Sequence, residues 1–421
     1  MSSELYQPMV GMSDLASPEI YLWQWLESKA RAVFERYAFE EVRTPILERT
    51  AVFDRSLGDT TDVVQKEMYR FTDRGGRDVA MRPEGTAGVM RFIAGQGNEG
   101  LESRVWYIGP MFRGERPAAG RRRQFHQVGA EALGPPSPAV DAEIIALQWH
   151  ILQEWGVEGC RIELNTRGLP EDRQRVVEAL RERLAGQRAS LCEDCQRRYD
   201  SNPLRILDCK QETCRKIMAA LPPVTSYMTE EARVYLSDVE SYLKRLEIPY
   251  EINPMLVRGL DYYVHTVWEI TRAGLGAQDA LAGGGRYQVT LGSRALEGVG
   301  FALGIERVVA ALISQGIDPK ALALRPRAWL VSQGEEAFVD NMVLMQTLRE
   351  RGVACGMDMQ GRSMKAQMRK ANKAGARFVV VRGEREMESG LFGLKDMDEG
   401  TQEDVDMPTL MERLCQPVQN A

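Results

Sequence analysis

The most informative segment of the chain is PMFRGERPAAGRRRQFH, residues 110–126. Apolar runs at 104–112 and 123–132 flank a loop rich in Arg, Gly and Pro, which predicts a strand, a basic loop and a second strand. Arg113 follows the apolar run directly, where a strand would hold its guanidinium as a rigid fork for phosphate or carboxylate. A solvated basic loop explains the arginines at 121–123, but it explains Arg113 less well.

The segments around this stretch predict hairpins rather than regular strand–helix alternation. Helices are expected over 19–38 and 140–155 and from about 304, a hairpin over 68–84, strands at 39–48, 250–271 and 298–303, and a glycine-rich turn at 283–287. Pro45 interrupts the run at 39–48. Since proline cannot donate to a strand ladder, this run must be an edge, a bulge or an interface element. Together the pattern predicts an α+β fold with an antiparallel sheet flanked by helices.

The 421 residues suggest two or three domains. Residues 169–248 are largely helical, charged and cysteine-bearing, which indicates an inserted subdomain. From residue 326 the pattern changes to regular strand–helix alternation, which predicts a small, mostly parallel sheet. We therefore expect one domain over 1–325, containing the insertion, and a C-terminal α/β domain over 326–421.

Composition excludes several classes of protein. Hydrophobic residues make up 44% and charged residues 27%, which excludes a disordered chain. No apolar run approaches about 18 residues, so no membrane span is expected. Since 54 basic and 60 acidic residues give a net charge of −6, RNA binding would require local basic patches. The start of the chain resembles no signal peptide and seven cysteines are an odd number, so a cytoplasmic protein is expected.

Four of the cysteines form a separate group, at positions 192, 195, 209 and 214. Four thiols within so short a segment could hold a structural zinc ion. However, four residues separate the second pair and no tight glycine turn lies within the first pair. The spacing therefore favours four reduced thiols and leaves zinc as the alternative. Among catalytic motifs, the sequence has no P-loop, no His-Glu-x-x-His and no nucleophile elbow.

Residues 110–131 resemble motif 2 of the class II aminoacyl-tRNA synthetases, and in detail that of the bacterial histidyl-tRNA synthetases. Further stretches match this family in order: VRTP at 42–45 (the end of motif 1), RPEGT at 82–86, LVRGLDYY at 256–263 (the histidyl signature peptide) and GFALGIER at 300–307 (motif 3). The resemblance covers essentially the whole chain. It implies a class II catalytic domain over 1–325, an anticodon-binding domain over 326–421, and a homodimer formed through motif 1.

The resemblance implies a histidine–tRNA ligase, which joins L-histidine to ATP as histidyl-adenylate and then transfers histidine to the 3′ end of tRNA(His). The first step brings two anions together, so cations rather than a general base are expected as catalytic groups. The implied catalytic residues are Arg113, Arg258 and Arg307. The implied ATP-binding residues are Arg113, Glu115, Arg121, Phe125, Arg258 and Arg307, with Mg²⁺ held on the phosphates.

The family also implies which residues bind histidine and tRNA. The histidine-binding set is Glu84, Thr86, Gln127, Glu131, Tyr262 and Tyr263, with Glu131 and Tyr263 on the imidazole. The tRNA-binding set is Arg116, Arg122, Arg123, Arg362, Lys365, Arg369 and Lys373. The last four belong to a segment, 361–382, with seven basic residues and no acid, where helical spacing is expected to align them on one face.

Two departures from the family pattern affect detail. Ala118 and Ala119 stand where the family often has Gln-Lys, and the segment after Tyr287 is a few residues short. An alternative is a catalytically silent paralogue that regulates histidine biosynthesis, although such proteins generally lack the C-terminal domain. A class II synthetase for another amino acid, such as proline or threonine, is disfavoured by Tyr262, Tyr263 and the peptide around Arg258.

Overall fold

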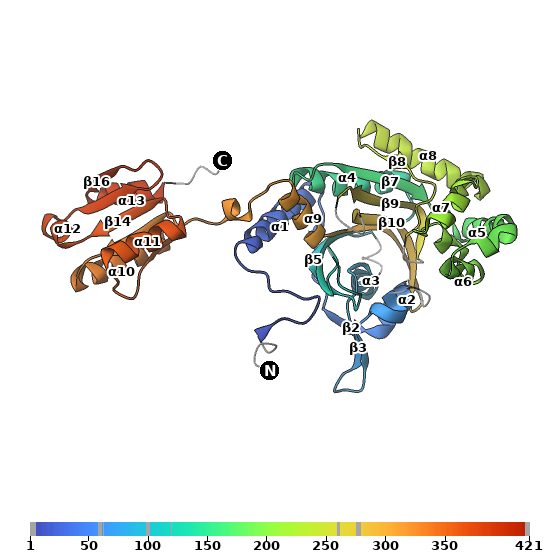
Figure 1. Cartoon of the computed structure of the whole chain (residues 1–421), viewed down its shortest axis with the longest axis horizontal. Coiled ribbons are helices and arrows are strands. Elements are labelled where there is room, and N and C mark those ends of the chain that lie inside the picture. Colours follow the sequence, from blue (N-terminus) through green and yellow to red (C-terminus); the bar gives the residue numbers. More distant parts are fainter. Residues whose placement is uncertain are drawn as a thin grey trace. The chain divides into compact units, whose positions relative to one another are not determined.

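The computed structural model describes residues 6–57, 61, 63–97, 102–118, 120–258, 262–274 and 279–416. The chain divides into two compact units, Met1–Ala321 and Leu322–Ala421 (Figure 1).

The larger unit is built on an eight-stranded sheet of order β1-β5-β6-β11-β10-β9-β7-β8. Its strands are β1 (Glu40–Glu41), β5 (Arg104–Phe112), β6 (Gln124–Leu133), β7 (Cys160–Thr166), β8 (Glu251–Ile252), β9 (Tyr263–Arg272), β10 (Ala280–Leu291) and β11 (Arg294–Gly304). Neighbours from β5 through β7 pair antiparallel, and only the short edge strands β1 and β8 pair parallel. This antiparallel-dominated sheet with helices confirms the predicted α+β class.

The run around Pro45 splits into two edge strands. β1 ends the large sheet, and β2 (Leu47–Arg49) ends a second sheet of order β2-β4-β3, in which β3 (Arg70–Thr72) and β4 (Asp78–Met81) form a hairpin. Arg82 fixes the break between them: its Nη1 donates to the Thr44 carbonyl at 2.8 Å and its Nε to the Pro110 carbonyl at 2.9 Å. The proline therefore lies at an edge.

Helices cover both faces of the large sheet, and the period of two along each strand sorts the side chains between them. On one face, Trp106 stacks on Phe34 of α1 (Glu19–Arg36) with ring centroids 4.7 Å apart, and Trp268 donates to Gln148 of α4 (Pro138–Glu154) at 2.5 Å. On the other face Tyr107 packs with α3 (Thr86–Gly95). Figure 1 shows α3 enclosed by the curved sheet. Two further helices, α2 (Thr50–Leu57) and α9 (Ile305–Ser314), complete this body.

The glycine-rich turn expected at 283–287 is wrong, because these residues lie inside strand β10. The glycines allow close approach of neighbouring groups rather than reversing the chain. A Cβ at Gly283 would lie 2.4 Å from Arg258 Cζ, and one at Gly285 would lie 2.6 Å from the Tyr263 ring. The chain turns later, at Gly292 (φ +64°), where Leu291 pairs with Arg294 in a two-residue hairpin. That tight hairpin is the form taken by the short segment after Tyr287.

The insertion consists of short helices around its own apolar core. They are α5 (Pro170–Leu184), α6 (Glu193–Ser201), α7 (Glu212–Ala219) and α8 (Glu230–Arg245), with 3₁₀ turns at Ala185–Ser190, Pro203–Ile206 and Val224–Tyr227. Leu180, Leu184, Ile206 and Met218 are buried in this core together with cysteines 195, 209 and 214.

The smaller unit holds a five-stranded sheet of order β13-β12-β14-β15-β16. Its elements are β12 (Ala328–Ser332), α10 (Glu335–Glu350), β13 (Cys355–Met357), α11 (Met364–Ala374), β14 (Phe378–Arg382), α12 (Glu384–Ser389), β15 (Phe392–Asp396), β16 (Gln402–Val405) and α13 (Met407–Cys415). β13, β12 and β14 are parallel, and the last two strands are antiparallel. In the described residues of either unit, no helix is long and apolar enough to cross a membrane.

Candidate active site

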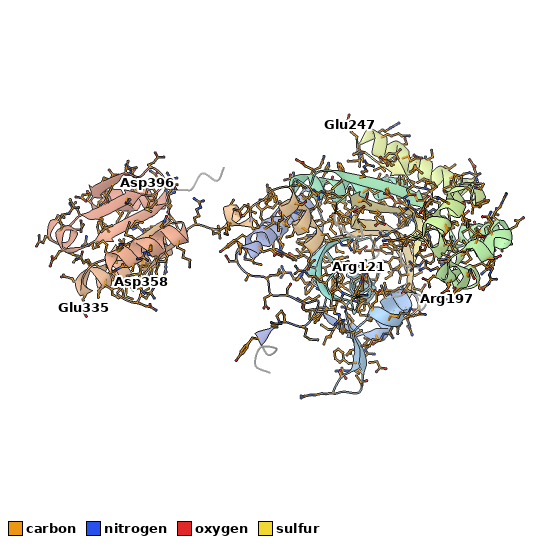
Figure 2. The ribbon with its side chains drawn as sticks, in the orientation of Figure 1. Arg121, Arg197, Glu247, Glu335, Asp358 and Asp396 are labelled. Atoms are coloured by element: carbon orange, nitrogen blue, oxygen red, sulfur yellow. The ribbon has the colours of Figure 1, made fainter. Side chains whose placement is uncertain are left out.

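A cavity of about 570 Å³ opens on the face of the large sheet that carries α3. Strands β6, β9, β10 and β11 supply its walls, and the loop between β5 and β6 supplies Arg121, which Figure 2 labels. The structure brings together in this cavity every residue predicted for catalysis, histidine binding and ATP binding: Glu84, Thr86, Arg113, Glu115, Arg121, Phe125, Gln127, Glu131, Arg258, Tyr262, Tyr263 and Arg307. Residues more than 200 positions apart thus meet at one surface.

Two buried carboxyl groups, of Glu84 and Glu131, line the cavity. Glu84 precedes α3 and accepts from the backbone N–H groups of Thr86 and Ala87 at 2.8 and 2.7 Å, which satisfies donors at the start of the helix. The Thr86 hydroxyl donates to Glu131 Oε1 at 2.7 Å. Burial raises the pKa of the Glu84 carboxyl, while its hydrogen bonds to the helix N–H groups oppose the rise. Thr86 therefore links the two carboxyl groups.

Glu131 lies where only a glycine can face it. In the pairing of β6 with β11, Gly300 is its partner, and a Cβ there would lie 1.8 Å from Glu131 Oε2. Burial raises the pKa of Glu131 to about 8. Its Oε2 and the Oε1 of Gln127 are buried, and in the described part of the chain neither accepts a well-formed hydrogen bond, although the Tyr287 hydroxyl interacts with the Glu131 carboxyl. The site thus presents polar oxygens that a ligand N–H group could satisfy.

Tyr262 and Tyr263 stand beside this pocket with ring centroids 4.7 Å apart. Burial raises the pKa of both phenols, so both remain neutral donors at physiological pH. The histidyl signature peptide that carries them does not continue the strand, as the run at 250–271 had predicted, because β9 begins only at Tyr263. Residues 259–261 of this peptide lie outside the described residues.

Three arginines also line the cavity: Arg113, Arg258 and Arg307. Arg113 donates through Nε to the Pro83 carbonyl at 2.9 Å, and its guanidinium lies 5.2 Å from the centre of the Phe125 ring. Arg258 donates to Glu269 Oε2 at 3.0 Å. These contacts orient each guanidinium and leave further N–H groups for a ligand.

Arg307 comes from the first turn of α9 and donates through Nε to the Gly120 carbonyl at 3.1 Å. Burial lowers the pKa of its guanidinium, and the nearby charge of Arg121 lowers it further. Glu115 offsets part of this positive field through its ion pair with Arg121 at 2.9 Å. An arrangement of mutually repelling cations around a cavity is suited to a polyanion.

The predicted tRNA-binding residues are divided between the two units. Arg122 lines the cavity, whereas Arg116 is exposed and Arg123 donates to the Glu115 carbonyl at 3.3 Å. Ala118 pairs with Arg121 in an isolated bridge, and Ala119 lies outside the described residues. In the smaller unit the four predicted residues, Arg362, Lys365, Arg369 and Lys373, are all exposed. α11 begins at Met364, so Arg362 precedes the helix on which helical spacing had placed it.

Sequence reasoning missed several residues of the lining. Glu269 and Thr271 project from β9, and the insertion contributes Arg205, Asp208 and Lys210. The period of two along β9 carried a signal for Glu269, because it alternates with buried Trp268 and Ile270. No comparable signal indicated that the insertion folds back to the cavity.

A curved antiparallel sheet whose cavity joins buried carboxyls to three arginines, followed by a separate α/β unit, defines a class II aminoacyl-tRNA synthetase. The family model for histidyl-tRNA synthetase matches residues 11–308, and the model for the anticodon binding domain matches residues 330–416. The chain belongs to the histidyl-tRNA synthetase family.

Individual relatives agree with this assignment. The histidine–tRNA ligase of Halothermothrix orenii is 43% identical over 96% of this chain and 97% of its own length, and that of a Geobacillus species is 42% identical over the same shares. The crystal structure of apo S. aureus histidyl-tRNA synthetase superposes with a TM-score of 0.80 at 34% identity, covering 97% of this chain and 99% of that one. These near-full-length matches support the ligase over the regulatory paralogue.

Proposed function

We propose that the cavity activates L-histidine with ATP. The histidine carboxylate attacks the α-phosphorus, a bond forms between the carboxylate oxygen and phosphorus, and pyrophosphate leaves. Since the carboxylate is already ionised, the site needs cations that hold two anions together and stabilise the developing charge. The observation that carries the proposal is that Arg113, Arg258 and Arg307 line one cavity with the buried Glu131.

We assign the roles of these residues from their positions. Arg113 would contact the α-phosphate and the substrate carboxylate, Arg258 the α-phosphate from another side, and Arg307 the γ-phosphate. Phe125, beside Arg113, would stack on adenine, with Glu115 and Arg121 at the rim of the nucleotide site. Mg²⁺ would be held by the β- and γ-phosphates and would neutralise part of their charge.

Histidine would be recognised by buried polar groups of the site that form hydrogen bonds with its imidazole. Glu131 Oε2 would accept from one ring N–H and Tyr263 would contact the other ring nitrogen, with Tyr262 behind it. Glu84, Thr86 and Gln127 would hold the α-amino group. An analogue without these N–H groups would leave buried acceptors unpaired, which costs about 10⁴-fold or more in specificity.

We further propose that the basic residues of the smaller unit contact the tRNA(His) backbone and that Arg116, Arg122 and Arg123 contact its acceptor end. The protein would act in the cytoplasm, where its tRNA is charged. Dimerisation would use the edge strands around Pro45; the exposure of Ile46 and Leu47 supports this.

The test is ATP–pyrophosphate exchange by the purified protein across twenty amino acids. Histidine alone should support exchange, and Arg258→Ala should abolish it, because its charge is lost from the α-phosphate. Arg161→Ala, on an exposed position of β7, is the matched control and should leave exchange unchanged. Exchange with another amino acid, or with none, would contradict the proposal.

A further inference from the structure

Folding brings together four cysteines that the cavity does not use. The Sγ atoms of Cys192, Cys195, Cys209 and Cys214 all lie within 4.8 Å of one another, and those of Cys192 and Cys209 are 3.8 Å apart. The first two belong to the start of α6, and the last two flank the start of α7. All four are free thiols in the structure.

The spacing matches one metal ion. With Zn–S bonds of about 2.3 Å, a tetrahedral ion places its sulfur ligands about 3.8 Å apart. A disulfide would need sulfurs at about 2.05 Å. The Sγ atoms of Cys192 and Cys209 are therefore too far apart for a disulfide bond, and their separation equals the one expected across a single zinc ion.

Two of the four sulfurs lie at the starts of helices. Cys192 is the N-cap of α6, and Cys214 lies in the first turn of α7, where helix dipoles favour negative groups. The backbone N–H of Cys192 donates to Cys214 Sγ at 3.2 Å, a contact that orients a metal-bound sulfur. Three of the thiols are buried and the fourth is half-buried, so the four donors close the site.

We propose that these four cysteines bind one structural zinc ion in a tetrahedral thiolate site. Four soft donors with no open position are typical of structural zinc rather than of a catalytic or oxygen-ligated metal. The sequence spacing alone favoured reduced thiols, because it could not show that the two pairs converge.

A metal site would join short elements of the insertion. Its helices α6 and α7 have only nine and eight residues, and each carries or follows one cysteine pair. A structural metal holds such short elements together. The segment between the two cysteine pairs also supplies Arg205 and Asp208 to the cavity, so the ion would hold these side chains in place. That consequence rests on the proposed function; the zinc site itself does not.

Metal analysis of the full-length protein, purified without chelator, tests the proposal. One zinc per chain is expected. Cys192→Ser and Cys209→Ser should each lose it, whereas Cys160→Ser, a half-buried cysteine outside the cluster, should retain it. Exchange of zinc for Co²⁺ should give the charge-transfer and intense d–d bands of a tetrahedral tetrathiolate.

Three results would overturn the proposal: all seven thiols reacting freely in the native protein without zinc release, iron in place of zinc, or a cobalt spectrum of six-coordinate oxygen ligation. The cobalt spectrum of the unmodified protein decides the question even if the serine variants do not fold. Histidine-dependent exchange is measured in parallel. A protein that holds zinc but lacks exchange would contradict only the proposed function.

Discussion

At the scale of single residues, the site depends on places where a side chain is absent. Gly300 leaves room for Glu131, Gly283 for Arg258 and Gly285 for Tyr263. Each glycine lies on β10 or β11, so functional side chains of neighbouring segments pack directly against the backbone of these central strands. Backbone proximity rather than turn formation explains these glycines.

Glu131→Gln should abolish histidine activation and change the pH dependence of stability. The pKa of Glu131 is raised from 4.5 to about 8 by burial. Between these values the folded protein keeps a proton that the unfolded chain releases, so the free energy of unfolding falls as pH rises. The variant lacks this titrating group. Relative to the difference at pH 4.5, its free energy of unfolding should exceed that of the unmodified protein by about 4 kcal/mol at pH 8. Urea unfolding of both proteins from pH 4.5 to 8 measures this difference. A difference that stays constant with pH would contradict the raised pKa of Glu131.

Gly283→Ala should displace Arg258, because the new Cβ would lie 2.4 Å from its guanidinium carbon. We expect ATP–pyrophosphate exchange to fall by roughly 10²-fold or more, as expected for a misplaced catalytic group. Gly95→Ala, at the end of α3 with no atom within 4 Å of its Cβ, is the control and should keep full activity. Equal activity of the two variants would show that catalysis does not require the Arg258 guanidinium to lie against Gly283.

At the scale of elements, a buried ion pair joins α4 to β10. Arg286 Nη2 lies 2.6 Å from Asp141 Oδ1, and both side chains are almost fully buried. Thr266 of β9 and Tyr235 of α8 also donate to Asp141, at 2.5 and 3.1 Å. One carboxylate thus connects two strands with two helices, including the helix that ends the insertion.

Asp141→Ala should lower the free energy of unfolding by about 3–5 kcal/mol, because it leaves the Arg286 charge buried without its partner. The control is Glu143→Ala on the same helix, which breaks the exposed pair with Arg104 and should cost about 1 kcal/mol or less. Denaturant unfolding of both variants provides the measurement. Similar losses for the two would contradict the importance of burial.

Sequence was most informative where chemistry is local. The strands at 104–112 and 123–132 and the helix at 19–38 follow from periodicity, and the resemblance to histidyl-tRNA synthetases assigned the three arginines to one site. Sequence reasoning failed where the role of a residue depends on partners that are distant along the chain. The glycines at 283–285 resemble a turn unless Arg258 and Tyr263 are seen beside them. Likewise, the approach of Lys210 to the cavity and the convergence of the cysteines depend on how the insertion folds.

At the scale of the whole molecule, the charges of the smaller unit are segregated. The segment 361–382 has seven basic residues and no acid, whereas 383–406 has nine acids and two bases. On α11, Ala371 is buried and Met364 and Met368 pack against the sheet. Lys365, Arg369 and Lys373 of the same helix are exposed. A basic helix face on a separate unit suits a phosphate backbone.

Arg369→Glu in the full chain should weaken tRNA(His) binding and raise the KM for tRNA by about tenfold or more, because a phosphate contact becomes repulsive. Histidine-dependent ATP–pyrophosphate exchange should be unchanged, since that step involves no tRNA. Arg351→Glu, an exposed position at the end of α10, serves as the control. Loss of exchange, or equal effects of both variants on tRNA charging, would contradict this role for α11.

We propose above that one cavity selects histidine, activates it and supplies it to tRNA. The most direct measurement is ATP-dependent charging of tRNA(His) by the full-length protein with labelled histidine, beside the Glu131→Gln and Arg258→Ala variants. We predict charging of tRNA(His) by the unmodified protein and none by either variant. Absence of charging by the folded, unmodified protein, or charging retained by either variant, would contradict this role of the cavity.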